Sequence, residues 1–257
     1  MIRFLFLLFI PIILFSEQQP LLDLNINEFD VQGNQVFLKG GVQIEYEQDR
    51  ITVDDEIQVE LKEEEGNPEI RSLTSLGRTE FVRMDSDGDP VLILLCYGKA
   101  KLDQENNELL MEKGDSDKQI CVKDLEGKIY ADRLYADFVI EEGKISPTKL
   151  LMEGDVRIYH RFPGFSQAVG SAHQYALADK ITYDPSTQVI LISAVPKNRV
   201  LFVDQLNHLR MSAPAIRIHR DSNSGKEVVQ GVGDVRLRFK KEEMDRMNLY
   251  FPSKEEA

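Results

Sequence analysis

Two short motifs in this sequence could carry chemistry, but each lacks a part that its chemistry requires. The segment 164–168 resembles a nucleophile elbow centred on Ser166, yet Ala168 stands where the last glycine belongs, and no strand-to-helix pattern surrounds the serine. Asp85, Asp87 and Asp89 offer oxygen ligands for calcium, but the sixth and twelfth places of an EF-hand loop are not the required Gly and Glu. An acidic turn is the favoured interpretation of that second motif.

The four histidines give no zinc-binding pattern. No two of them are spaced to share one face of a helix, and none is followed by a pair of cysteines. They are His160, His173, His208 and His219. The sequence therefore predicts no metal site, no cofactor and no catalytic residue, and we expect a protein that is not an enzyme.

The N-terminus has the pattern of an export signal. Arg3 precedes an apolar run from Phe4 to Phe15, which is followed at once by a polar stretch. Because a membrane-spanning helix needs about 20 apolar residues, this run favours a cleaved signal peptide over residues 1–16 rather than a permanent anchor. Retention of the run as an anchor is the alternative.

The charge of the chain argues against nucleic acid as a partner. The formal net charge is −13, and removal of residues 1–16 takes away only Arg3, which leaves 30 basic against 44 acidic residues, or −14. The longest basic cluster is the pair Lys240-Lys241. A phosphate backbone would meet net repulsion.

Cys96 and Cys121 are the only cysteines, and an exported chain enters an oxidising compartment in which disulfides form. A disulfide between them is expected, closing a loop of about 25 residues and removing roughly 3 kcal/mol of unfolded-state freedom. The alternative is two separate buried thiols, since Cys96 lies within the apolar run 91–97.

Apolar and polar residues alternate along most of the chain, which predicts strands rather than helices. Clusters of Asp, Gly, Ser, Asn and Pro separate the runs and favour tight turns. The strand-like runs include 36–44, 51–61, 128–138, 151–159, 178–183, 189–193, 200–203, 216–219 and 228–239. No amphipathic helix is predicted before residue 240, so the expected class is all-β. The acidic stretch 60–67 is expected to be a long loop, and the charged stretch after residue 239 a short helix or a frayed tail.

A looser repeat places a glycine one residue ahead of an alternating strand. It recurs at Gly41, Gly98, Gly154 and Gly233, with separations of 57, 56 and 79 residues. A glycine there fits a bend or bulge where positive φ or close backbone approach is needed. The uneven spacing indicates a degenerate repeat with insertions rather than a regular solenoid.

The segment 176–184, together with 189–192, Val200 and 211–218, resembles the LptA/OstA-like family, the periplasmic lipopolysaccharide transport proteins of Gram-negative bacteria. The likeness extends loosely over 36–239. Departures are Ala194, where the family often has Gly, and insertions around 60–90 and 160–175. The resemblance implies a partly open, V-shaped antiparallel β-jelly roll of many short strands, whose apolar interior takes acyl chains and whose terminal strands pair with neighbouring modules.

These observations divide the chain into a signal peptide (1–16), an N-terminal extension (17–35), an OstA-like lipid-binding jelly roll (36–239) and a charged C-terminal tail (240–257). Water release from acyl chains, at about 0.8 kcal/mol per buried methylene, would drive binding to an apolar groove. The candidate groove residues are Val36, Leu38, Val42, Ile44, Ile51, Val53, Leu134, Ala136, Phe138, Leu151, Val156, Ile158, Ile181, Tyr183, Val235 and Leu237. An ordinary filled sandwich core made of the same residues is the alternative.

The resemblance implies a periplasmic carrier that binds the lipid A acyl chains of lipopolysaccharide and bridges proteins of the inner and outer membranes. Unpaired strand edges near 36–44 and 228–239 would bind other OstA-like proteins, or further copies of this chain head to tail. Two alternatives stay open: a membrane-anchored LptC-like lipid acceptor, and a structural or adhesive envelope β-protein without lipid cargo.

Overall fold

The computed structural model describes residues 23–46, 48–64, 67–125, 127–141, 144–161, 173–205, 208–220 and 227–238, which contain strands and their connections and no helix. The expected signal peptide, the Ser166 motif and the charged tail lie outside these residues. The strands are β1 (Asp23–Asn25), β2 (Glu28–Gln32), β3 (Gln35–Lys39), β4 (Val42–Tyr46), β5 (Asp49–Val53), β6 (Glu56–Glu64), β7 (Asn67–Met84), β8 (Pro90–Asp103), β9 (Glu108–Glu112), β10 (Ile120–Asp124), β11 (Gly127–Ala131), β12 (Arg133–Glu141), β13 (Lys144–Arg161), β14 (His173–Asp184), β15 (Val189–Ser193), β16 (Val200–Asp204), β17 (Leu209–Ala213), β18 (Ala215–Arg220), β19 (Glu227–Val232) and β20 (Arg236–Arg238).

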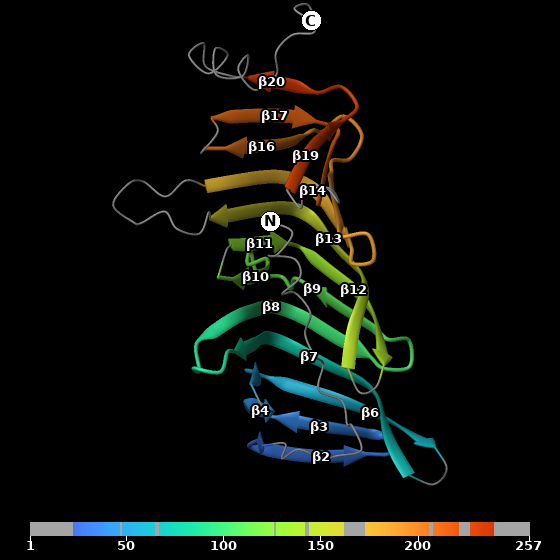
Figure 1. Ribbon diagram of the computed structural model, residues 1–257. Coiled ribbons are helices and arrows are strands. Elements are labelled where there is room, and N and C mark those ends of the chain that lie inside the picture. The colour runs from blue at the N-terminus through green and yellow to red at the C-terminus, as the bar shows by residue number, and fades with distance from the viewer. Residues whose placement is uncertain are drawn as a thin grey trace, which may run out of the picture.

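All strand pairs are antiparallel, with β2 at one end of the stack and β20 at the other (Figure 1). Several strands pair beyond their successor in the chain, as β3 does with β6 and β17 with β20. The expectation of an all-β, antiparallel fold is confirmed. Within the described residues no helix is long and apolar enough to cross a membrane.

The pairing divides the sheet into two walls. Wall A runs β1, β4, β5, the second half of β7, the first half of β8, β10, β11, the second half of β13, the first half of β14, β16, β17 and β20. Wall B runs β2, β3, β6, the first half of β7, the second half of β8, β9, β12, the first half of β13, the second half of β14, β15, β18 and β19. Each long strand, or each pair of consecutive short strands, therefore crosses from one wall to the other; we call such a unit a passage of the chain.

The crossing points form a crease between the walls. The long strands β7, β8 and β13 pass through it at a glycine, β14 passes through it without one, and elsewhere the chain breaks there into two strands. At Gly154, φ is +82°, and an added Cβ would lie 2.7 Å from Cβ of Asp132 on the neighbouring passage. The amide of Asp132 donates to the carbonyl oxygens of Glu153 and Gly154, at 3.0 Å each. Gly77 has φ +88° and lies against Asp55 in the same way, so two of the crease positions require glycine for both conformation and space.

The repeated glycines of the sequence map onto this crease. Gly41, Gly154 and Gly233 have positive φ, as expected for bends, whereas Gly98 does not. At Gly98 the requirement is close backbone approach, because an added Cβ would meet the backbone of Glu112, Lys113 and Gly114.

Two segments differ from expectation. The acidic stretch 60–67 is not a long loop, because β6 continues to Glu64 and β7 begins at Asn67. Leu61 opposite Ile70 continues the apolar alternation, and Lys62 pairs with Glu69 at 3.6 Å, so cross-strand contacts outweigh the acidic composition. The N-terminal extension also holds strands: β1, β2 and the first residue of β3 lie within 17–35.

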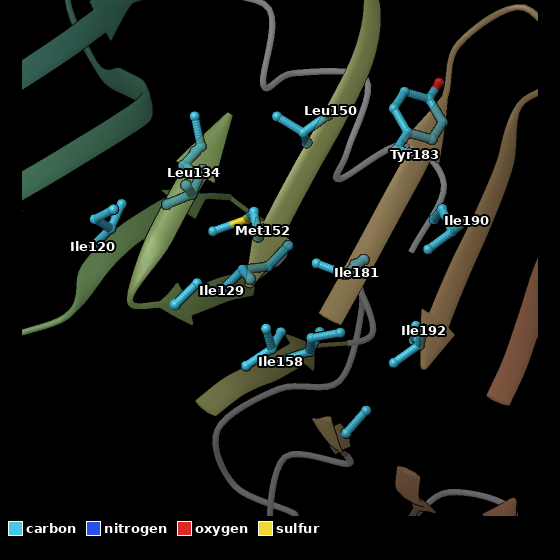
Figure 2. Close-up of a cluster of buried hydrophobic side chains, with 14 of the residues drawn as sticks. Ile120, Ile129, Leu134, Leu150, Met152, Ile158, Ile181, Tyr183, Ile190 and Ile192 are labelled. Carbon is cyan, nitrogen blue, oxygen red and sulfur yellow. The ribbon is translucent and has the colours of Figure 1, made fainter. Parts of the chain in front are cut away.

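The interior between the walls contains one large apolar cluster and a smaller one. The large cluster spans β7 to β18, and the smaller one, around Leu38, Val53 and Ile57, lies at the N-terminal end. Figure 2 shows side chains of both walls in the large cluster, with Ile129 and Ile158 from wall A near Met152 and Ile181 from wall B. These residues are at most 1% exposed, so the middle of the stack is held by close packing.

Candidate functional site

The sides of the two walls that face each other are apolar along most of the stack. In wall A, strand register aligns Val122, Ile129, Ile158, Ala176 and Phe202 in one row. A matching row in wall B contains Leu134, Met152, Ile181, Ile192 and Ile216. Because side chains alternate across a strand, each row lies entirely on the interior.

Most of the candidate groove residues lie in this interior. Leu38, Val42, Val53, Leu134, Phe138, Val156, Ile158, Ile181 and Tyr183 are buried. Val36, Ile44, Ile51 and Ala136 are partly buried and pack against the same clusters.

The prediction that Leu151 faces the groove is wrong. It lies between the buried residues Leu150 and Met152 and therefore faces the other side of wall B, where it is aligned with Tyr135 and Thr182. In the apolar run Leu150-Leu151-Met152, the sequence does not show which residues face the interior, and the prediction assigned Leu151 to the interior in place of its neighbours.

The interior is closed in the middle of the stack. Its larger side chains there, such as Tyr183, Phe202 and Ile190, are no more than 2% exposed. Burial raises the pKa of the Tyr183 phenol to about 12, with the charge of Asp184 adding to the effect, so this phenol is neutral at physiological pH. An acyl chain in this region would have to take the place of side-chain contacts between the walls.

The ends of the interior are exposed. At the N-terminal end, Phe29 and Val31 of β2 are 62% and 52% exposed, although register places them on the same side as the buried cluster around Leu38. At the C-terminal end, the candidates Val235 and Leu237 are 36% and 52% exposed, and Leu237 is aligned with Met211 of the interior. The apolar rows thus end in uncovered side chains on the terminal strands.

Another interior row of wall A, farther from the crease, is largely polar, with Leu92 as an apolar member. It includes Asp49, Asp124, His160, Gln174 and Asp204, all buried. Gln174 donates to the Asp204 carboxylate at 2.9 Å, and Arg83 pairs with Asp49 at 2.9 Å. This row confines the apolar surface of wall A to the rows nearer the crease.

Several residues of the interior are not among the candidates that the sequence indicates. Phe29 and Val31 lie in the segment taken as an extension, while Ile190, Ile192, Ile216 and Ile218 lie in strands that the alternation did predict. The alternation of the isoleucines was a sufficient signal for their orientation. Nothing in the sequence distinguishes the polar row from ordinary surface positions before the register of the strands is known.

The expected disulfide is absent, since Cys96 and Cys121 are both free. Cys96 alternates with Leu92 and Leu94 on the interior, whereas Cys121 is aligned with Leu95 on the outer side of the same wall. The two thiols therefore lie on opposite faces of the sheet and cannot be joined without rotation of a strand. Burial raises the pKa of both thiols, which lowers their reactivity.

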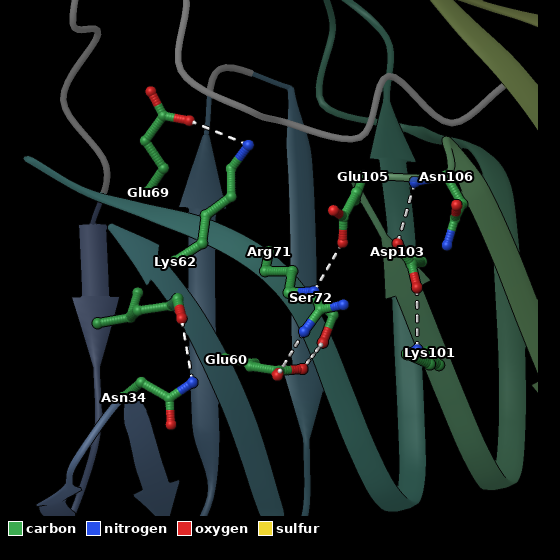
Figure 3. A network of polar contacts seen from close by, with 11 residues as sticks. Asn34, Glu60, Lys62, Glu69, Arg71, Ser72, Lys101, Asp103, Glu105 and Asn106 are labelled. Atoms are coloured by element: carbon green, nitrogen blue, oxygen red, sulfur yellow. Dashed lines mark hydrogen bonds and ion pairs between the residues drawn. The ribbon is translucent and has the colours of Figure 1, made fainter. Parts of the chain in front are cut away.

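The outer side of wall B carries ion pairs within and between strands near the N-terminal end (Figure 3). Arg71 lies between Glu60 and Glu105, at 3.1 and 2.7 Å, and Lys101 pairs with Asp103 at 3.0 Å. Burial works against the charged form of Asp103, but hydrogen bonds from Lys101 and Asn106 outweigh it and lower its pKa. Among the described residues no three His, Cys, Asp or Glu side chains are grouped to hold a metal.

No protein-family model matches this chain, and no curated protein matches it either. Among solved structures, it is similar to LptH from Pseudomonas aeruginosa, described as the LptA homologous periplasmic component of the lipopolysaccharide transport device. The superposition covers 55% of this chain and 90% of LptH, with 8% sequence identity and a TM-score of 0.39.

Proposed function

We propose that this protein is a periplasmic lipid carrier that holds the acyl chains of lipopolysaccharide between its two walls and passes them between envelope partners. The supporting observation is the pair of facing apolar surfaces, which run through the stack and end in uncovered side chains at both terminal strand pairs. Methylene burial at about 0.8 kcal/mol per group supplies the affinity, and no catalytic residue is needed.

The exposed ends define how cargo enters and leaves. Phe29 and Val31 at one end and Leu237 at the other extend the interior rows to strands that, among the described residues, are paired on one side only. A partner strand paired at such an edge continues both the sheet and its apolar side. The partners are other OstA-like proteins or a further copy of this chain, arranged head to tail.

The close packing in the middle of the stack means that transport of an acyl chain requires the two walls to move apart. Since the interior side chains there are nearly fully buried, the walls must separate before an acyl chain can occupy the space between them. The interactions that hold the walls together there are apolar contacts, and an acyl chain supplies contacts of the same kind. Binding of an acyl chain thus replaces apolar contacts between the walls with apolar contacts between each wall and the chain.

Site-specific photo-crosslinking to lipopolysaccharide tests this function. A photoreactive residue at Phe138, which is 5% exposed on the interior, is expected to label lipid A, whereas one at the adjacent Val139, 37% exposed on the outer side, is not. Ile181 and Thr182 form a second inner and outer pair. Equal labelling of inner and outer positions, or labelling of neither, would contradict lipid carriage.

The closed interior favours one competing function, a structural bridge that stacks through its ends without cargo. Mass spectrometry of the exported protein, purified under mild conditions, separates the two. A co-purifying acylated lipid supports the carrier, and a lipid-free protein that still assembles end to end supports the bridge. N-terminal sequencing of the same sample distinguishes a cleaved carrier from an anchored acceptor, which would retain residues 4–15.

A further inference from the structure

The outer side of wall A carries an apolar and aromatic surface in the C-terminal two thirds of the stack. Tyr130, Tyr159 and Tyr175 lie on β11, β13 and β14, with ring centroids 6.0 Å apart for the first pair and 6.5 Å for the second. Leu177 and Leu201 are directly paired beside them. Tyr159, Leu177 and Leu201 are 44%, 46% and 48% exposed, so this surface is uncovered over three neighbouring strands.

Cations are interleaved with these residues by strand register. Arg157 is aligned with Tyr130 on one side and Leu177 on the other, and its guanidinium lies 5.8 Å from the Tyr130 ring. Lys128 is aligned with Tyr159, and Arg210 with Val203. Tyr130, Tyr159 and Leu177 therefore each have a cation on a neighbouring strand, about 4.8 Å away.

The cations extend beyond the tyrosines to both sides. Lys123 precedes them on β10, while Arg236 and Arg238 follow on the terminal strand β20. Among the described residues, the strands from β10 to β20 place one carboxylate on this side of wall A, that of Asp155 on β13, because Asp124 and Asp204 point to the interior. The nearest carboxylates are at the crease, where Asp155 lies 3.3 Å from Arg157 and Asp234 lies 3.4 Å from Arg236.

This distribution is unusual for a chain with a formal net charge of −13. Seven wall A strands lie side by side here, which at about 4.8 Å spacing gives a face roughly 30 Å long. Figure 1 shows β11, β16, β17 and β20 in the upper part of the stack, on the same side of the molecule. We call the face formed by Lys123, Lys128, Tyr159, Leu177, Leu201 and Arg210 the tyrosine face.

We propose that the tyrosine face docks on the surface of a bilayer that contains anionic phospholipid. Tyrosine and leucine beside lysine and arginine match the headgroup region of such a bilayer, where apolar groups enter and cations meet phosphate. An acidic protein would satisfy the cations but not the interleaved apolar side chains. This docking concerns the outside of wall A and does not depend on acyl chains binding between the walls.

Tryptophan fluorescence tests the proposal directly, because the chain contains no Trp. Leu177→Trp places a probe on the tyrosine face, and Leu191→Trp places the control on the outer side of wall B, at a position 38% exposed. Vesicles of phosphatidylglycerol and phosphatidylcholine are expected to shift the emission of the first variant to shorter wavelength and to leave the second unchanged. No shift, or the same shift in both, overturns the proposal.

Charge reversal provides an independent measurement. Lys123→Glu/Arg210→Glu alters two exposed cations of the tyrosine face, and Lys149→Glu/Arg217→Glu alters two exposed cations of wall B, so both variants change the net charge by −4. Loss of two cations, each contributing about 1 kcal/mol near an anionic surface, predicts about thirtyfold weaker vesicle binding in sedimentation for the first pair only. Equal weakening by both pairs contradicts a localised site. An emission shift of Leu177→Trp with polyglutamate but not with vesicles would assign the face to an acidic protein and also overturn the proposal.

Discussion

The interior side of this sheet has the same orientation pattern along the whole stack, but its middle and its ends differ in burial. Phe202 of β16 and Phe29 of β2 both point to the interior, yet Phe202 is 2% exposed and Phe29 is 62% exposed. Phe202 has a paired strand on each side and the opposite wall above it, whereas Phe29 lies on an edge strand. Alternation therefore fixes which way a side chain points, and neighbouring strands fix whether it is covered.

The largest predicted effect comes from truncating these two phenylalanines. Phe202→Ala should lower the free energy of unfolding by about 3–5 kcal/mol, because it leaves a cavity among packed side chains. Phe29→Ala should change it by less than about 0.5 kcal/mol, as expected for an exposed position. Urea unfolding of both variants measures the difference. Similar losses would show that the N-terminal end is as closed as the middle.

A smaller effect is expected at the crease in the middle of the stack. Gly154→Ala should destabilise the protein by about 1–3 kcal/mol, since positive φ and the close approach of Asp132 both oppose a Cβ. Gly88→Ala is the matched control, because Gly88 has φ +84° but open space around its Cα. The difference between the two in thermal unfolding isolates the packing part. If the two variants are equally stable, the crease is not tightly packed.

The carboxylate of Asp132 makes the middle crease dependent on pH. Burial works against its charged form, but the hydrogen bonds from Gln119 and Lys113 outweigh burial and lower its pKa. A lowered folded-state pKa contributes stability above the unfolded value of about 3.9, and this is lost as pH falls through the folded value. Asp132→Asn should therefore cost up to about 1 kcal/mol at pH 7 and less at pH 3. A cost that is the same at both pH values would exclude a role for the charge.

The smallest predicted effect is that of a reducing agent. With Cys96 on the interior and Cys121 on the outer side of wall A, no disulfide constrains the unfolded chain, and dithiothreitol should leave the melting temperature unchanged. Cys121→Ser should behave the same way with and without the reagent. A decrease of several degrees on reduction in the unaltered chain alone would show that a bond forms after all.

The sequence was sufficient for the all-β class and for the orientation of most interior side chains. Residues such as Leu134, Val156 and Ile181 alternate with polar neighbours, and one buried face imposes that period of two. It failed where two apolar residues were adjacent, as at Leu151, and where composition hid a pattern, as in the acidic hairpin of β6 and β7. In both cases the partner strand decides the phase, and the partner is not visible in local sequence.

The candidate site likewise has features that the sequence alone predicted and features that only the tertiary structure decided. That apolar rows exist followed from the alternation, and several glycines marked the crease because only glycine takes positive φ there without strain. The tertiary structure decided three other features. Cys96 and Cys121 face opposite sides of the sheet, the middle of the interior is closed while its ends are exposed, and the cations of the tyrosine face lie on one wall. Register brings together residues that are distant in sequence, and it depends on contacts along the whole stack rather than on any one segment.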